Sequence, residues 1–194
     1  MNQQTLSFIN CQVRELTLDA LPIRESIDKD LPAIVQLHRR AFADEDLVPL
    51  VEDLLGSDEG VMSLVAVIED QIVGHVVFTH CNVPAFGNRA VLLGPLAVDP
   101  DVQRQGIGGR IVENGLQRLA RDRVAVVFVL GDPAYYSRFG FSPEAFIEPP
   151  YPLPKELESW KDAWQSKYLT VPPATEKARL SVPRQWQRPE LWAP

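Results

Sequence analysis

The sequence is poor in cysteine and has no long apolar run, and each shortage excludes a class of protein. Cys11 and Cys81 are the two cysteines among 194 residues, and they lack the paired spacing of metal ligands, so neither a disulfide framework nor a metal site is predicted. No apolar stretch reaches the roughly 18 residues of a membrane span. The N-terminus also lacks a basic segment followed by an apolar one, the pattern of a secretory signal. We therefore expect a cytoplasmic protein with no membrane partner.

Basic residues are outnumbered by acidic ones. The chain has 19 Lys and Arg against 26 Asp and Glu, a net charge of -7 and a pI near 5.0. This balance argues against a nucleic-acid partner and favours a neutral or cationic small substrate. A length of 194 residues with 45% hydrophobic content suits one globular domain with a sizeable core.

The rest of the chain is organised around the stretch from Leu92 to Phe141. Two almost continuously apolar segments in it are typical of strands buried on both faces, and a helix between them makes a right-handed βαβ unit. The elements expected here are a strand at Val91–Val98, a glycine-bearing turn at Gln103–Gly109, a helix to about Arg121, a strand at Val124–Leu130, and a short helix carrying Tyr135 and Tyr136.

The turn places three glycines, Gly106, Gly108 and Gly109, just where the helix begins. The first amides of a helix have no internal partner and lie at the positive end of its dipole, so they suit a phosphate, and glycine lets the oxygens approach closely. Arg104 and Arg110 can add charge nearby. Taken alone, the glycines are equally well explained by a tight turn with close helix–strand packing. A dinucleotide-binding motif does not fit, because it requires Gly-x-Gly-x-x-Gly directly after the first strand.

Two motifs in this stretch resemble the GNAT superfamily of N-acetyltransferases, which use acetyl-coenzyme A. The first is the pyrophosphate loop, Gln/Arg-x-x-Gly-x-Gly/Ala, matched by Gln103, Gly106 and Gly108 after a Val-x-Pro lead-in at residues 98–100. The second is Tyr-x-x-x-Gly-Phe after the next strand, matched at residues 136–141. Their order, with a helix and a strand between them, makes the pair specific. The surrounding sequence is similar to the YhbS-like bacterial subgroup, closely over residues 74–141 and more loosely from residue 21.

The resemblance implies an α/β (α+β) GNAT fold: a central mixed, twisted sheet splayed between strands 4 and 5, with helices on both faces. Gly94-Pro95 fits the splay, because proline cannot donate to a sheet ladder and belongs at a bulge or an edge; a proline near an exposed strand start is the alternative. In the family the pantetheine arm of the cofactor lies in that gap and pairs with the strand. The acetyl-CoA-binding residues implied are Leu96, Ala97, Val98, Gln103, Arg104, Gln105, Gly106, Ile107, Gly108, Gly109, Arg110, Asp132 and Tyr136.

Acetyl transfer to an amine requires a polarised thioester carbonyl, a neutral amine and a protonated leaving thiolate. A backbone N–H near Leu96 or Ala97 can serve as the oxyanion donor. Tyr136 stands at the family position of a general-acid tyrosine, and a phenol is protonated at neutral pH. The neighbouring Tyr135 is predicted to pack. Asp132, followed by a proline, is predicted first to cap a helix and only second to contact the cofactor.

The general base is not identifiable from the sequence. The candidates are His38 on an early helix, His75 and His80 on opposite faces of one strand, and Glu45 and Asp46 at a helix junction that borders the acceptor site in the family. Each is more readily explained as structural or solvated.

The flanking regions complete the predicted domain. Before the central stretch we expect a strand at Leu21–Arg24, a helix capped by Asp28 or Asp30 and ending near Phe42, a helix over Leu47–Leu55, and a hairpin of Met62–Glu69 with Ile72–His80. Residues 1–20 are an N-terminal extension, residues 21–148 the acetyltransferase core, and residues 149–194 a segment rich in proline and tryptophan. Disordered tails are poor in aromatics, so this segment is predicted to dock on the core, with a helix at Leu153–Trp164 and strands at Tyr168–Val171 and Arg179–Val182.

The function predicted is transfer of an acetyl group from acetyl-CoA to a primary amine, of a small molecule or of a protein, by direct attack in a ternary complex. No covalent acetyl-enzyme is expected, because neither cysteine lies in the cofactor motifs. The alternative is a non-catalytic acyl-CoA-binding sensor or partner protein with the same fold. The sequence leaves a homodimer open.

Overall fold

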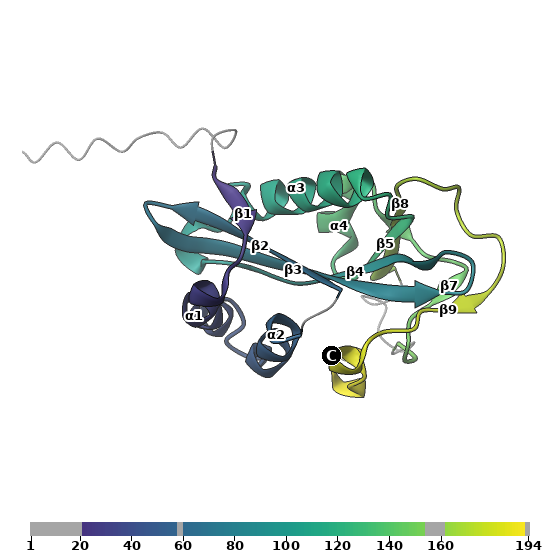
Figure 1. Ribbon diagram of the computed structural model, residues 1–194, viewed down its shortest axis with the longest axis horizontal. Coiled ribbons are helices and arrows are strands. Elements are labelled where there is room, and N and C mark those ends of the chain that lie inside the picture. The colour runs from purple at the N-terminus through teal and green to yellow at the C-terminus, as the bar shows by residue number, and fades with distance from the viewer. Residues whose placement is uncertain (1–20, 58–59, 154–161, 193–194) are drawn as a thin grey trace, which may run out of the picture.

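The computed structural model describes residues 21–57, 60–153 and 162–192. Its centre is a seven-stranded twisted sheet with the order β1-β2-β3-β4-β5-β8-β6 (Figure 1). Neighbouring strands are antiparallel except β4 and β5, which are parallel. The strands are β1 (Ile23–Glu25), β2 (Val61–Ile68), β3 (Gln71–Val83), β4 (Gly87–Val98), β5 (Val126–Leu130), β6 (Ser142–Pro143) and β8 (Trp164–Tyr168).

Helices cover both faces of this sheet. In Figure 1, α3 (Ile107–Arg121) and α4 (Pro133–Tyr136) lie above it, and α1 (Leu31–Ala41), α2 (Val48–Leu55) and the C-terminal segment lie below. The core is divided accordingly into clusters on the two sides of the sheet, each built from alternate residues of the same strands. The predicted fold class is confirmed.

Close contact between α3 and the sheet depends on two glycines. A Cβ at Gly115 would lie 2.2 Å from the ring of Phe78, and a Cβ at Gly74 would lie 2.4 Å from Cδ1 of Ile111. The helix therefore rests directly on β3. Gly74 also adjoins a shift in register between β2 and β3 after Ala66, so a β-bulge and the close approach of α3 meet at this glycine.

The sheet is splayed where the sequence places Gly94-Pro95. Strands β4 and β5 pair only from Ala90 with Val126 to Leu93 with Val129. Beyond Leu93, β4 continues to Val98 while paired with β3 alone, after a register shift between Val76 and Phe78. The predicted bulge is confirmed, and it leaves one edge of β4 without a neighbouring strand over its last residues.

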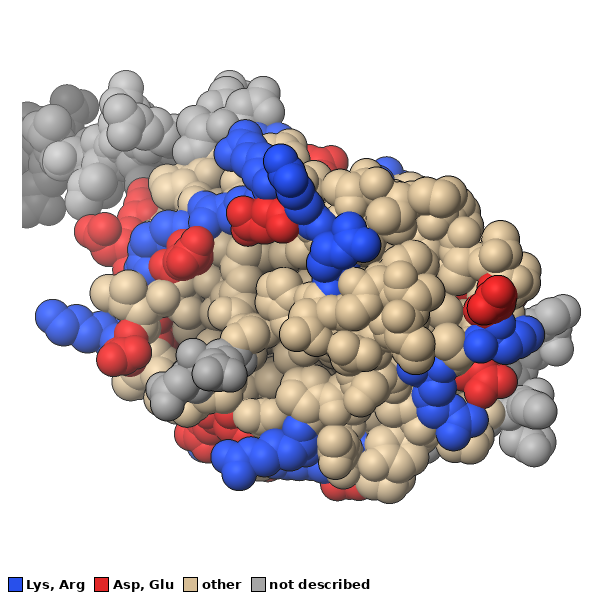
Figure 2. Space-filling view, turned by 45° about the vertical axis from the view of Figure 1, so that its right-hand side comes forward, with Lys and Arg blue, Asp and Glu red and all other residues tan. Residues whose placement is uncertain are grey.

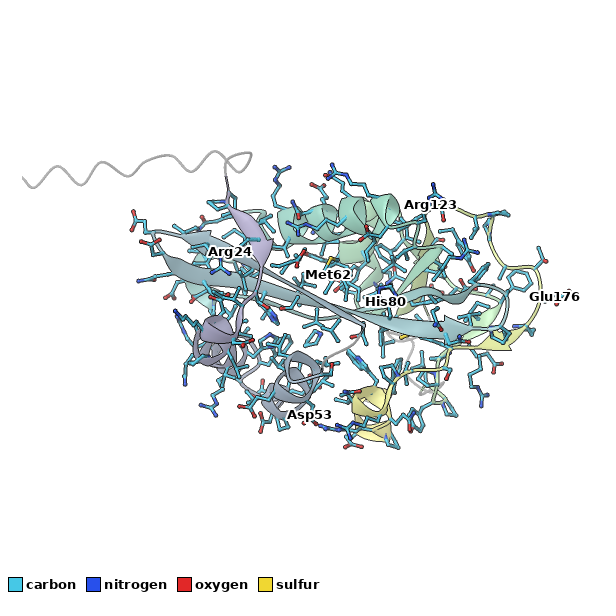
Figure 3. All side chains as sticks on the ribbon, viewed as in Figure 1. Arg24, Asp53, Met62, His80, Arg123 and Glu176 are labelled. Carbon is cyan, nitrogen blue, oxygen red and sulfur yellow. The ribbon has the colours of Figure 1, made fainter. Side chains whose placement is uncertain are left out.

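The C-terminal segment packs against α2 and the lower face of the sheet. Trp164, Trp186 and Trp192 are buried, and each indole N–H donates a hydrogen bond, to Ile147 O, Thr79 Oγ1 and Trp186 O respectively. An ion pair between Arg188 and Asp53, the residue labelled on α2 in Figure 3, joins this segment to the helix. A short parallel pair of β7 (Ile147–Glu148) with β9 (Ala178–Arg179) holds the intervening chain.

Several predicted boundaries were wrong. The C-terminal end of the helix expected at Leu153–Trp164 is a turn followed by β8, which starts at Trp164 because it pairs antiparallel with β5; residues 154–161 lie outside the described residues. The late strands are likewise displaced from Tyr168–Val171 and Arg179–Val182 to the bounds of β8 and β9. The predicted N-terminal extension and Trp160 also fall outside the described chain.

The expected cap of the first helix was also wrong. Asp30 precedes α1 but makes no side-chain capping bond. Its carboxylate instead accepts hydrogen bonds at 2.5 and 2.9 Å from the Arg24 guanidinium and one at 2.9 Å from the Ile27 N–H. The ionic partner holds the pKa of Asp30 below its ordinary value.

Candidate functional site

A cavity of about 920 Å³ opens at the splayed edge of β4, between the start of α3 and α4. Most residues predicted to bind the cofactor line it: Leu96, Val98, Gln103, Arg104, Gly106, Ile107, Gly108, Gly109, Arg110 and Asp132. Ala97, Gln105 and Tyr136 are not among its lining residues. The walls also include residues that the sequence did not single out as binding: Glu113, Ala134, Tyr135, Arg138 and Phe139.

The floor of this cavity is the N-terminus of α3. Gly106 precedes the helix in the left-handed conformation, with φ at +86°, which glycine adopts without steric cost. Arg110 is the first residue whose N–H bonds back to Gly106 O, at 3.0 Å. The N–H groups of residues 107–109 therefore have no partner within the helix and present the positive end of its dipole to the cavity.

The loop before the helix is held from two sides. The Gln103 side-chain amide donates to Val98 O at 3.0 Å. Arg40 of α1 pairs with Asp99 at 2.5 Å and with Asp101 at 2.8 Å. These contacts fix the turn relative to both β4 and α1, so the amides are oriented in advance of any ligand.

The free edge of β4 directs alternate main-chain groups into the gap. The Asp99 N–H bonds to Val73 O of β3 at 2.9 Å, so the carbonyl of Val98, on the same peptide, points the other way. Alternation along the strand then directs the N–H and C=O of Leu96 toward the gap and those of Ala97 toward β3. Ala97 is 1% exposed, in keeping with this arrangement.

Tyr135 lines the first cavity, whereas the neighbouring Tyr136 does not. Tyr135 was predicted to pack, and its ring does contact Phe139 with centroids 5.4 Å apart, but it also lines the cavity beside Gly108. Arg138 lies over the Tyr135 ring, 4.5 Å from its centroid, and brings a further cation to this wall. The Asp132 carboxylate accepts from the Ala134 N–H at 2.8 Å, which is the helix cap that its sequence context indicates.

A second cavity, of about 520 Å³, lies on the other side of the gap and shares Leu96 with the first. Its walls come from the α1–α2 junction, the kink in β4, the end of β5 and the C-terminal segment. The lining residues are Phe42, Asp44, Glu45, Leu47, Leu50, Leu92, Leu93, Gly94, Pro95, Leu96, Leu130, Tyr136, Trp186, Glu190, Leu191 and Trp192.

Tyr136 lines this second cavity, next to the gap. Its side chain is 9% exposed, and its hydroxyl has no hydrogen-bond partner among the described residues. Burial, reinforced by the nearby Tyr135 and Asp132, raises the pKa of the Tyr136 hydroxyl well above its ordinary value. The group is therefore a protonated donor throughout the neutral range.

Two of the candidate bases are enclosed in the core. His38 Nε2 and His75 Nδ1 lie 2.8 Å apart, and His75 Nε2 lies 2.9 Å from Ser63 Oγ. Burial lowers the pKa of His38 to about 4 and that of His75 well below its ordinary value. Neither lines either of the two cavities.

The other three candidate bases, His80, Asp46 and Glu45, lie outside the core. His80, labelled in Figure 3, is exposed and lies near the Asn88 carbonyl. Asp46 accepts from the Val48 N–H at the start of α2. Only Glu45 of the five lines the second cavity, where it is joined by Asp44 and Glu190. Glu190 escaped sequence analysis because it comes from the distant C-terminal segment.

Within the described part of the chain, potential metal ligands are dispersed and the thiol of Cys81 is buried. Residues 21–57, 60–153 and 162–192 contain no group of three His, Cys, Asp or Glu placed to hold a metal ion. Burial raises the pKa of Cys81 to about 12, which leaves its thiol unreactive near neutrality. None of the helices within those ranges has the length and apolarity to cross a membrane. On the face seen in Figure 2, basic and acidic groups lie mostly around a broad uncharged centre.

Comparison with known proteins gives consistent matches. A family model described as an acetyltransferase (GNAT) domain matches residues 22–143. YjhQ of Escherichia coli (strain K12), named as an uncharacterized N-acetyltransferase, is 35% identical over 153 residues, which cover 75% of this chain and 83% of that protein. The structure of YhbS from Escherichia coli in complex with CoA has a TM-score of 0.73 and 30% identity, covering 87% of this chain and 92% of that one. A GNAT family acetyltransferase from Brucella melitensis in complex with acetyl-CoA has a TM-score of 0.69 and 25% identity, covering 86% and 98%.

Proposed function

The chain belongs to the GNAT family of acetyltransferases, and we propose on this premise that it moves an acetyl group from acetyl-CoA to a primary amine by direct attack in a ternary complex. The observation that carries the proposal is the pair of cavities meeting at Leu96, one with the first amides of α3 in its floor and one with Tyr136 in its wall. Two relatives of similar fold were crystallised with CoA or acetyl-CoA. The acceptor is a small-molecule amine or, as a second form of the same reaction, a protein amine.

The residues present fit acetyl-CoA. The free amides at the start of α3 suit a pyrophosphate, with Arg104 and Arg138 as flanking cations. The main-chain groups of Leu96 and Val98 suit the amides of a pantetheine arm lying along β4 as an added strand. Bound there, acetyl-CoA supplies an acetyl group activated as a thioester.

Groups on this chain are available for two of the chemical requirements, the polarised carbonyl and the protonated leaving group. The Leu96 N–H is directed into the gap and is placed to donate to the oxygen of a thioester carbonyl. A C–N bond forms and the C–S bond breaks; the amine loses a proton, and the departing sulfur gains one from the Tyr136 hydroxyl. The amine proton passes to water in the cavity, and no side chain is assigned as its base. The products are an amide and free CoA.

A non-catalytic acyl-CoA sensor remains the second candidate. It is favoured by the enclosure of His38 and His75, which keeps two of the candidate general bases out of both cavities. Under this alternative the first cavity binds the same ligand and the second takes no acceptor.

Calorimetric titration with acetyl-CoA, together with CoA release across a panel of primary amines, tests the proposal. Binding with turnover on at least one amine is the expected result. Binding with no turnover on any amine would favour the sensor. Absence of binding would overturn the cofactor assignment and both candidate functions with it.

We expect Gly108→Ala to weaken acetyl-CoA binding about tenfold. A Cβ at position 108 would lie 2.6 Å from the Tyr135 hydroxyl oxygen and 3.3 Å from Cγ2 of Val98. Relief of the first contact requires the Tyr135 ring to move, and the space available to it is the cavity. Calorimetry on the two proteins measures the change in Kd.

The matched control for this prediction is Tyr135→Phe in the Gly108→Ala background. Removing the hydroxyl deletes the closest contact and should recover most of the lost affinity, beyond the effect of Tyr135→Phe alone. A double variant as weak as the single one would show that crowding by Tyr135 is not the cause.

A further inference from the structure

The second cavity is apolar along its depth and acidic at its mouth. Trp186, Leu92 and Tyr136 line it and are buried, so they mark its inner end. Asp44, Glu45 and Glu190 line the same cavity but are exposed. The polarity of the cavity thus changes from one end to the other.

The three carboxylates come from two separate parts of the chain. Asp44 and Glu45 belong to the α1–α2 junction, and Glu190 belongs to the turn Pro189–Trp192, held in place by the buried Trp192. None of the three makes an ion pair with another residue in the described ranges. Arg188, the cation nearest to Glu190 in sequence, is already paired with Asp53. The mouth therefore presents negative charge that is not compensated by the described part of the protein.

The inner end points to a ligand in its own right. Tyr136 is 9% exposed and lines the cavity, and its hydroxyl has no hydrogen-bond partner among the described residues, so it is free to donate to a ligand. No described charged side chain lines this end to hold an ammonium group. An amine that reacts here must arrive neutral, so the carboxylates at the mouth are not needed to bind the nitrogen that is acetylated.

We propose that the acceptor is an elongated diamine: a primary amine that reacts at the inner end, an apolar segment along the walls, and a second cationic group held at the mouth by Asp44, Glu45 and Glu190. The inference rests on the proposed acetyl transfer and specifies its substrate class. An apolar segment can pack against the apolar walls of the cavity. The hydroxyls of a sugar-like amine would lose their hydrogen bonds to water there. A cation at the mouth is attracted from a distance and then held, whereas a carboxylate at the same place is repelled.

Three probes with the same number of carbon atoms test the charge at the outer end: 1,7-diaminoheptane, n-heptylamine and 7-aminoheptanoate. We expect kcat/KM for the diamine to exceed that of heptylamine about tenfold, and that of the amino acid to be the lowest. The diamine advantage should shrink as salt is raised from about 0.05 to 0.5 M, because exposed charges are screened. Heptylamine turned over as well as the diamine would overturn the inference and leave the proposed function standing; no turnover of any amine would overturn both.

A binding measurement, which does not depend on catalysis, further separates the diamine inference from the proposed acetyl transfer. Calorimetric titration of the protein–CoA complex with 1,7-diaminoheptane measures the outer contact whether or not acetyl is transferred. The triple change Asp44→Asn, Glu45→Gln and Glu190→Gln should bring the ratio of diamine to heptylamine affinity close to 1. The control is Glu176→Gln, which removes one negative charge at an exposed site labelled in Figure 3 that does not line the second cavity, and there the ratio should stay near that of the wild type. A ratio that the triple change does not alter would sink the proposal.

Discussion

Replacing Tyr136 with phenylalanine is expected to lower kcat about 10²- to 10³-fold while leaving the Kd for acetyl-CoA within about twofold. Tyr136 lines the second cavity and not the first, which holds the glycine turn proposed to bind the cofactor phosphates. Its proton is needed only as the C–S bond breaks, so its loss acts on the transition state and not on cofactor binding. Steady-state kinetics and calorimetry on the same two proteins measure the split.

The change should leave the fold intact. The Tyr136 ring packs on Phe141 with centroids 5.7 Å apart and on Tyr135 with centroids 4.9 Å apart, and phenylalanine keeps these contacts. Its hydroxyl makes no hydrogen bond to a described residue, so removing it leaves no unsatisfied partner. Tyr168→Phe is the matched control, because it deletes a hydroxyl that donates to Glu144 and lines neither cavity. Equal kcat in wild type and Tyr136→Phe would mean that water or the incoming ammonium protonates the sulfur.

The pH profile gives the same hypothesis a second test. Because burial raises the pKa of Tyr136, this acid stays protonated across the range in which acceptor amines lose their protons. The rate should therefore rise with pH as the amine becomes neutral, with no falling limb below about pH 10 from this residue. A falling limb between pH 7 and 9 that disappears in Tyr136→Phe would contradict the raised pKa.

The parts of the fold that the sequence predicts are those with local signals. The apolar strands around the glycine turn, the amphipathic α3 and the break at Gly94-Pro95 all lie in the stretch from Leu92 to Phe141 or directly beside it, so each is predicted from neighbouring residues. The glycine turn could be predicted from the sequence because its geometry requires a left-handed residue at Gly106 and a close contact at Gly108.

What the sequence could not predict depends on contacts between distant segments. Strand β8 begins at Trp164 because it pairs with Leu130 of β5, and nothing within residues 153–171 encodes that register. Glu190 reaches the acceptor cavity only because the buried Trp192 anchors its turn beneath the sheet. Asp30 has the sequence position of a helix cap, yet Arg24 on the preceding strand binds it more strongly than the helix does.

The buried histidine pair should make the protein sensitive to acid. In the folded chain the pKa of His38 is about 4 and that of His75 is well below its ordinary value, mainly because burial disfavours the charged ring. In the unfolded chain both return to about 6.5. Below that pH the unfolded state binds more protons than the folded one, so stability is complete above about pH 7 and falls as the pH drops.

The groups around the pair do not reverse this direction. Ser63 is hydrogen-bonded to His75, Ser26 to Ser63, and the Phe42 ring stacks on His38. The Asp30 carboxylate favours a charged His75, but this effect is smaller than those of burial and of His38. From His38 alone, the free energy of unfolding should fall by about 2 kcal/mol between pH 7.5 and 5 and by about 3 kcal/mol at the acid limit.

Urea unfolding of wild type and of His38→Leu/His75→Leu at about pH 7.5 and pH 5 measures this loss. The double variant should lose much less stability than wild type over the same interval, whatever its stability at pH 7.5. His80→Gln, which removes an exposed histidine, should keep the wild-type pH dependence. If the double variant loses as much stability as wild type, the acid sensitivity originates elsewhere, and the carboxylates that are ion-paired in the folded state become the groups to examine.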